Sequence, residues 1–231
     1  MRFCKALFCS GILCLLFSCV TAQDTAKIYP QERIGKRLHP GLIASTGPYF
    51  LLIKASGPHS DSLKYIHSNV QTEFGMGIAL EYKLSTHFSL LFSPSVIIVN
   101  YDLNYLFANK EWYNIGANGI SSTIELPLDV EFFFNRHKNH NKYILAGAGI
   151  KKLINTAFTS DQGYIPLNPN EYCLEAGGGM EFYMHHFKIK IQGKYSVGLD
   201  NMLLQPVTDF GETVAGVYSS EVLFSIALMS Y

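Results

Sequence analysis

The eight histidines are the side chains best suited to metal binding or acid–base catalysis. His87 and Ser89 open a predicted strand and could form a dyad, but side chains two residues apart share a face in any strand, and no third group orients them. Six other histidines fall in predicted turns and polar loops without a third metal-like ligand: His59, His67, His137, His140, His185 and His186. The sequence therefore predicts no catalytic residue, no metal ligand and no enzymatic activity.

Two glycine-rich stretches are the candidates for binding a nucleotide, Gly147-Ala148-Gly149 and Gly177-Gly178-Gly179. A phosphate-binding loop leads into the start of a helix. Both stretches instead lie inside strand patterns, so we expect no cofactor. Glycine in a strand leaves room for large neighbouring side chains, here the inward lysines of the following strand.

Charged residues form the most regular pattern in the chain. In residues 70–84 the even positions from Phe74 onward are apolar, whereas the odd positions include Glu81 and Lys83. Such a strand has one apolar face and one charged face. The same two-residue period recurs in residues 123–134, where Phe133 is the main exception, and in residues 172–184 and 187–199.

These strands and four less regular ones predict a β-barrel. The regular segments have about 11 to 13 residues, enough to cross a bilayer at a tilt, whereas strands of soluble proteins average roughly 5 or 6. Short turns and long polar loops alternate between the strands, as in outer-membrane barrels. We expect strands near residues 41–54, 70–84, 87–101, 123–134, 142–154, 172–184, 187–199 and 217–231.

The predicted fold class is thus all-β: a small antiparallel up-and-down transmembrane barrel of about eight strands. A soluble sandwich or lipocalin-like barrel is the alternative, with its apolar face turned inward. In the membrane barrel the charges face an interior that side chains fill, and they must neutralise one another. We predict a structural charge network of Glu73, Glu81, Lys83, Glu125, Asp129, Glu131, Glu175, Glu181, Lys188, Lys190 and Lys194.

The N-terminus resembles a signal peptide. Arg2 and Lys5 precede an apolar run at residues 6–17, which is too short to span a bilayer, and small residues follow up to Ala22. Cleavage is expected between Ala22 and Gln23. The chain then comprises a signal peptide (1–22), an N-terminal periplasmic segment (23–37) and an outer-membrane barrel domain (38–231).

Four of the five cysteines lie in the signal segment, so cleavage leaves Cys173 without a disulfide partner. Lipidation of Cys19 is the alternative to cleavage after Ala22. Either way the chain is exported, and we predict an integral protein of the Gram-negative outer membrane. Tyr231 resembles the C-terminal assembly signal of outer-membrane barrels, although the apolar residues before it have the opposite parity.

The partners predicted for such a barrel are outer-membrane lipids and the barrel assembly machinery. The 18 basic and 18 acidic residues balance, which argues against a nucleic-acid partner.

Two passages stand out: Glu125-Leu126-Pro127-Leu128-Asp129-Val130-Glu131-Phe132-Phe133-Phe134 and Gly198-Leu199-Asp200-Asn201-Met202-Leu203. Together they resemble the PorT family of outer-membrane barrels. The resemblance covers most of the mature chain. It implies a role in the type IX secretion system, which transports proteins across the outer membrane and supports gliding motility, with other secretion components as partners. A narrow, charge-filled barrel suits an accessory or assembly role better than the conduit.

Two alternatives belong to other functional classes. A general structural or adhesive barrel of the OmpA or OmpX type would act through its long external loops. A lipid-modifying enzyme would need a catalytic constellation that the sequence does not offer.

Overall fold

The structure is a computed structural model that describes residues 37–55, 63–99, 102–107, 112–116, 121–136, 140–154, 157–160, 163–166, 168–202 and 214–230. The predicted signal peptide, its cleavage site at Ala22 and Gln23, the start of the barrel domain and Tyr231 are not decided by it, because residues 1–36 and 231 lie outside this range. Within the described part, no helix has the length and apolar character needed to cross a membrane.

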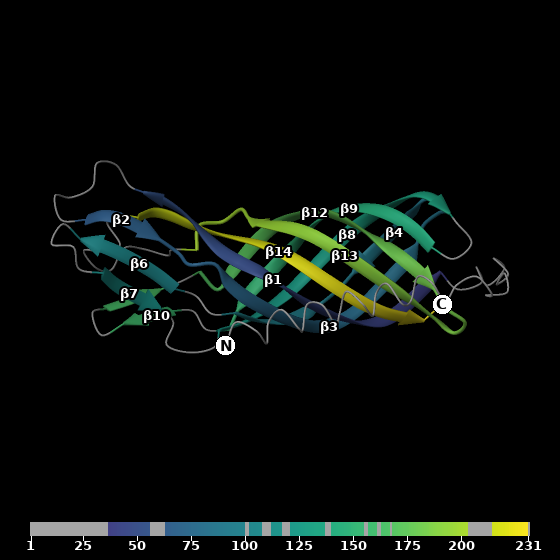
Figure 1. Cartoon of the computed structure of the whole chain (residues 1–231), viewed down its shortest axis with the longest axis horizontal. Helices are drawn as coiled ribbons and strands as arrows, with labels where there is room; N and C mark the ends of the chain where they lie inside the picture. The colour runs from purple at the N-terminus through teal and green to yellow at the C-terminus, as the bar shows by residue number, and fades with distance from the viewer. Residues whose placement is uncertain are drawn as a thin grey trace, which may run out of the picture. The chain divides into compact units, whose positions relative to one another are not determined.

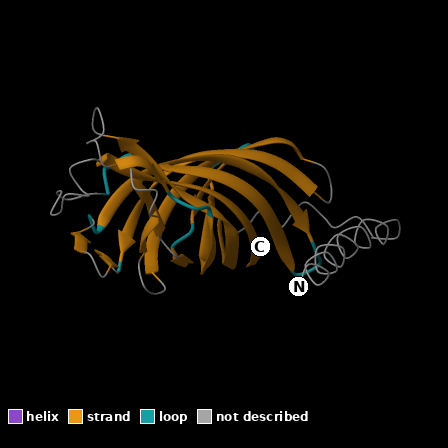
Figure 2. Ribbon diagram, turned by 60° about the vertical axis from the view of Figure 1, so that its left-hand side comes forward, coloured by secondary structure: helices purple, strands orange, loops and turns teal. Residues whose placement is uncertain are grey.

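One antiparallel sheet closes on itself to form a barrel (Figures 1 and 2). Neighbouring strands follow the order β1-β14-β13-β12-β9-β8-β4-β3, and β3 pairs with β1 to complete the circle. The strands are β1 (Leu38–Ala55), β3 (Gln71–Lys83), β4 (Phe88–Phe92), β5 (Ser95–Val99), β8 (Ser121–Arg136), β9 (His140–Leu153), β12 (Asn170–Tyr183), β13 (Phe187–Gly198) and β14 (Val214–Ser230). Because β4 and β5 share the place between β3 and β8, the barrel has eight positions, as the sequence predicts.

The strand predicted near residues 87–101 is interrupted at Ser93 and Pro94. Proline has no N–H group to donate to a neighbouring strand. The register is nevertheless kept, since Phe92 pairs with Leu80 and Ser95 with Gly77 on β3. The Ser93 N–H also donates to the Pro127 carbonyl at 3.3 Å. The two segments therefore act as one barrel strand with a local loss of ladder hydrogen bonds.

The two described short turns lie at one end of the barrel, and the long connections lie at the other. Leu84–His87 joins β3 to β4, where the Ser85 hydroxyl accepts the Phe88 N–H at 3.1 Å. Met184–His186 joins β12 to β13. We call this the turn end, and the opposite end, where the chain leaves β1, β5, β9 and β13, the loop end.

The long connections, which the sequence alone shows only as polar loops, contain strands. β2 (Leu63–His67), β6 (Asp102–Phe107) and β7 (Trp112–Gly116) form a three-stranded sheet, and β10 (Ala157–Ser160) pairs with β11 (Gly163–Pro166). Segments from two different connections meet in the three-stranded sheet, because β2 follows β1 whereas β6 and β7 follow β5. Short sequence patterns could not show this pairing.

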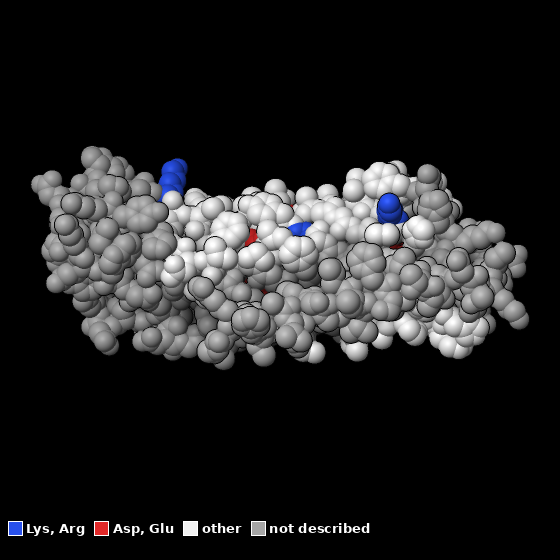
Figure 3. Space-filling view, in the orientation of Figure 1, with Lys and Arg blue, Asp and Glu red and all other residues white. Residues whose placement is uncertain are grey.

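The outside of the barrel is apolar. Met76, Phe74, Phe224 and Ile226 are among the most exposed large apolar side chains, at 76%, 62%, 59% and 57%. On the face seen in Figure 3 most of the described surface is uncharged, with only a few charged side chains visible. Exposed apolar side chains alternate with buried polar ones along the strands, which is the pattern of a transmembrane barrel rather than a soluble one. This outward apolar face excludes the soluble sandwich or lipocalin-like barrel, whose apolar face would turn inward.

Candidate functional site in the barrel interior

The interior of the barrel is lined by buried ionisable side chains. Ten of the eleven residues of the predicted charge network are buried there, and Lys83 is half-buried. Three further members that the sequence analysis missed are Lys151, Glu171 and Glu221, each at most 2% exposed. Glu221 and Glu171 alternate with outward apolar neighbours, so their parity was a usable signal. Lys151 was ambiguous because Lys152 follows it.

Near the turn end, Lys188 and Lys190 of β13 lie among three carboxylates. We call Glu81, Glu131, Glu181, Lys188 and Lys190 the turn-side cluster. The Lys190 Nζ donates to both oxygens of Glu131, at 2.5 and 2.6 Å. The Lys188 Nζ donates to Glu81 and, at 3.0 Å, to Glu181. Each carboxylate therefore contacts at least one buried ammonium group.

Aromatic rings complete the turn-side cluster. The Lys190 Nζ lies 4.7 Å from the ring centroid of Tyr143 and 5.7 Å from that of Phe133. Contact with two aromatic faces favours the cation electrostatically. The inward position of Phe133, which breaks the sequence alternation, thus has a packing role. Tyr183 donates to Glu181 at 2.7 Å and accepts from the Lys83 Nζ at 3.4 Å.

Toward the loop end the carboxylates outnumber the lysines. We call Glu73, Glu125, Asp129, Glu171, Glu175, Glu221, Lys151 and Lys194 the loop-side cluster. The Lys151 Nζ lies 2.5 Å from Glu221 Oε1 and 3.4 Å from Glu125 Oε1. The Lys194 Nζ donates to Glu175 Oε2 at 2.7 Å. Two lysines here face six carboxyl groups.

Two loop-side carboxyl groups have no hydrogen-bond donor among the described residues. Glu73 and Asp129 are both 0% exposed, and neither oxygen of either group accepts a hydrogen bond there. Buried carboxylates are stable only when a cation, a donor or a proton compensates them. The interior charges therefore do not balance as predicted. The whole described interior has nine buried carboxyl groups and four buried lysines, and six of these carboxyl groups but only two of the lysines lie in the loop-side cluster.

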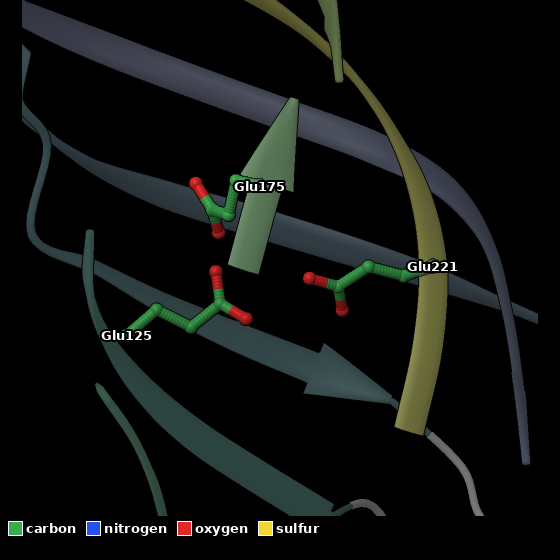
Figure 4. A group of neighbouring side chains, drawn as sticks. All are labelled: Glu125, Glu175 and Glu221. Carbon is green, nitrogen blue, oxygen red and sulfur yellow. The ribbon is translucent and has the colours of Figure 1, made fainter. Parts of the chain in front are cut away.

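Three of the loop-side carboxyl groups converge. Glu125 of β8, Glu175 of β12 and Glu221 of β14 each place an oxygen within 4.8 Å of the others (Figure 4). A small polar cavity borders this group at Glu125. It is lined by Ser45, Ser93, Ser95, Gln192, Ser225, Lys194 and Glu125, with Ile43 and Leu223 as apolar neighbours.

Glycine gives one inward carboxylate the space it occupies. A Cβ atom on Gly147 of β9 would collide with Asp129 Oδ1 and with the Leu128 backbone on the adjacent strand. Glycine is needed at this close approach. The neighbour accommodated at Gly147 is an aspartate. At Gly177 of β12, a Cβ would instead meet Lys194 of the following strand, as predicted from the sequence.

The candidate catalytic residues are not assembled into a dyad. Ser89 is buried and donates to Glu131 Oε2 at 2.6 Å, whereas His87 is exposed and lies 3.0 Å from Thr86 Oγ1. His185 and His186 are exposed in a turn with their rings 4.2 Å apart. Cys173 is buried, and its thiol lies 3.8 Å from Glu175 Oε1.

No family model matches the chain, and no curated protein matches it either. Solved structures do. The outer membrane protein OprG from Pseudomonas aeruginosa is 9% identical with a TM-score of 0.51, over 84% of this chain and 92% of that one. Neisserial surface protein A is 10% identical with a TM-score of 0.47, over 83% and 96%. The attachment invasion locus protein Ail of Yersinia pestis is 13% identical with a TM-score of 0.38, over 84% and 99%.

The likeness to OprG concerns the fold. Together with the apolar exterior and the closed eight-position sheet, it identifies the chain as a small integral β-barrel of the outer-membrane type. The membrane location predicted from the sequence agrees with this class. Membrane lipids are therefore the partners that the outer face requires.

Proposed function

We propose that this protein is a structural or adhesive outer-membrane barrel that acts through its loop end and does not conduct solutes. The observation that carries the proposal is the filled interior. In the turn-side cluster Lys188, Lys190 and their carboxylate partners cross the lumen, linking β13 to β3, β8 and β12. A barrel of this size has little more room than its own side chains occupy.

The structure of the loop end supports an adhesive role. Its connections pair into a three-stranded sheet, β2-β6-β7, and a hairpin, β10-β11. Binding residues commonly lie on loops held by a rigid scaffold. Structured connections at the end of a filled barrel offer a surface for binding a partner. In the same proposal the chain is not an enzyme, and no residue is given a catalytic role.

Participation in type IX secretion, expected from the PorT resemblance, is the second candidate. The filled interior favours an accessory or assembly role over the conduit if the protein belongs to such a system. None of the three solved structures described above adds to this role. The two candidates predict different consequences of deleting the gene.

A deletion strain separates the candidates. We expect an unchanged set of secreted proteins and reduced surface attachment or reduced resistance to detergent. Wild-type protein should restore the phenotype, whereas a variant with residues 63–67 and 102–116 replaced by short glycine–serine linkers should not. Selective loss of secreted proteins would favour the secretion role instead. A large, stable conductance of the purified protein in planar bilayers would contradict both forms of the proposal.

A further inference from the structure

The loop-side cluster has the geometry of a cation site. Glu125, Glu175 and Glu221 come from three different strands and are each at most 4% exposed. Their oxygens lie within 4.8 Å of one another, close enough for one ion to contact all three (Figure 4). A convergence of this kind needs independent support, because acidic residues also gather without an ion.

Glu73 provides that support. It is 0% exposed, and neither of its oxygens accepts a hydrogen bond from a described residue. Glu221 and Glu125 act on it electrostatically more strongly than Lys151 does, and its carboxyl group is within hydrogen-bonding range of Glu221, so Glu73 borders the three converging carboxyl groups. An unpaired buried carboxylate facing two others is stable only with a further positive charge or a proton.

The lysines do not supply enough charge. Lys151 contacts Glu221 and Glu125, and Lys194 contacts Glu175, which leaves Glu73 without an ammonium partner among the described residues. Asp129 adds one more uncompensated carboxyl group nearby. The turn-side cluster has no comparable surplus, so the deficit is local to one half of the interior.

We propose that Glu73, Glu125, Glu175 and Glu221 bind a calcium ion inside the barrel. Oxygen donors suit hard cations, and Ca²⁺ accepts irregular sets of carboxylates with water completing the shell. Mg²⁺ fits less well, because it requires near-octahedral geometry and gives up its water reluctantly. The ion would link β3, β8, β12 and β14 across the lumen. This inference does not depend on the proposed function.

Bound metal is measured directly. The mature chain is refolded from urea into detergent micelles with CaCl₂, MgCl₂ or EDTA, so that the ion can enter before the barrel closes. Free metal is removed by gel filtration, and retained metal is determined by atomic emission. We expect the wild type to retain about one Ca²⁺ per chain. Its thermal unfolding, followed by circular dichroism, should occur at a higher temperature with Ca²⁺ than with EDTA.

Glu73→Gln is the decisive variant, because it removes a proposed ligand without leaving a lysine unpaired. We expect its calcium affinity to fall by about tenfold or more, with loss of the calcium-dependent rise in unfolding temperature. Glu181→Gln in the turn-side cluster is the matched control: it lowers stability but should retain calcium as the wild type does.

The opposite results overturn the proposal. If wild-type protein retains no calcium and unfolds at the same temperature with EDTA, protons neutralise the cluster. Full calcium retention by Glu73→Gln would place any ion elsewhere. Retention of Mg²⁺ in preference to Ca²⁺ would refute the choice of metal.

Discussion

The two halves of the barrel interior are built from the same residue types but differ in charge balance. Inward positions of β13 read Lys188, Lys190, Gln192, Lys194 and Ser196 from the turn end to the loop end. Both inward positions nearest the turn end are thus lysines, whereas only one of the next three is. Carboxyl groups do not thin out in the same direction. The turn-side cluster is therefore internally paired, whereas the loop-side cluster depends on something in addition to its own lysines.

The pairing in the turn-side cluster predicts the largest stability effect. Lys190→Met leaves Glu131 without its bidentate partner and removes a contact to Glu81 at 3.6 Å. We expect a loss of about 3–5 kcal/mol in the free energy of unfolding, as for other broken buried ion pairs. Urea unfolding in micelles or lipid vesicles measures it.

Adding Glu131→Gln to Lys190→Met tests whether the loss comes from the orphaned charge. The double variant should recover part of the stability, because Glu131 is then no longer a buried unpaired carboxylate. A double variant that loses the sum of both single effects would show that Lys190 acts through packing on Tyr143 and Phe133 and not through its charge.

Adjacent lysines on β9 test the loop-side cluster against the outer surface. Lys151 is buried and contacts Glu221 and Glu125, whereas Lys152 is exposed. We expect Lys151→Met to cost about 2–4 kcal/mol in EDTA. Lys152→Met should stay within about 0.5 kcal/mol, as surface substitutions usually do. Equal effects of the two substitutions would mean that loop-side ion pairs add nothing to stability.

The sequence predicts the fold well because the alternation is local and repeated in every strand. It also identifies most inward residues by parity alone, Glu73 and Lys188 among them. It misses Glu221 although the alternation with Val222 and Phe224 places Glu221 inward, because the polar residues Ser219 and Ser220 before it show no alternation. It cannot tell which carboxylate meets which lysine, since Lys151 and Glu221 are 70 residues apart and meet only through the barrel register. A surplus of carboxyl groups is already visible in the predicted network, which has seven acidic residues and four lysines. Which of these carboxyl groups lack a lysine partner depends on the barrel register and could not be predicted.

Glycine substitutions test whether the close approach of β9 to Asp129 on β8 requires a residue without a side chain. Gly147→Ala places a Cβ against Asp129 and the β8 backbone, so we expect a loss of about 1–3 kcal/mol from overpacking. Gly193→Ala is the matched control, because its Cβ would meet only Phe224 ring atoms at 3.5 and 3.6 Å, an ordinary contact. Urea unfolding of both variants gives the difference. Equal stability would mean that β9 can shift away from Asp129 at no cost.

Glu73→Gln should produce the smallest effect and the one with the opposite sign. In EDTA, Glu73→Gln replaces a buried carboxyl group by a neutral amide of nearly the same shape. The substitution therefore removes either an uncompensated charge or the free-energy cost of protonating the carboxylate. We therefore expect unfolding to cost about 1 kcal/mol more than in the wild type. Glu131→Gln removes a carboxylate that accepts from Lys190 and Ser89, so the same chemical change should destabilise the turn-side half. If both glutamines destabilise the barrel in EDTA, the two halves are equally well compensated, and the contrast between them is wrong.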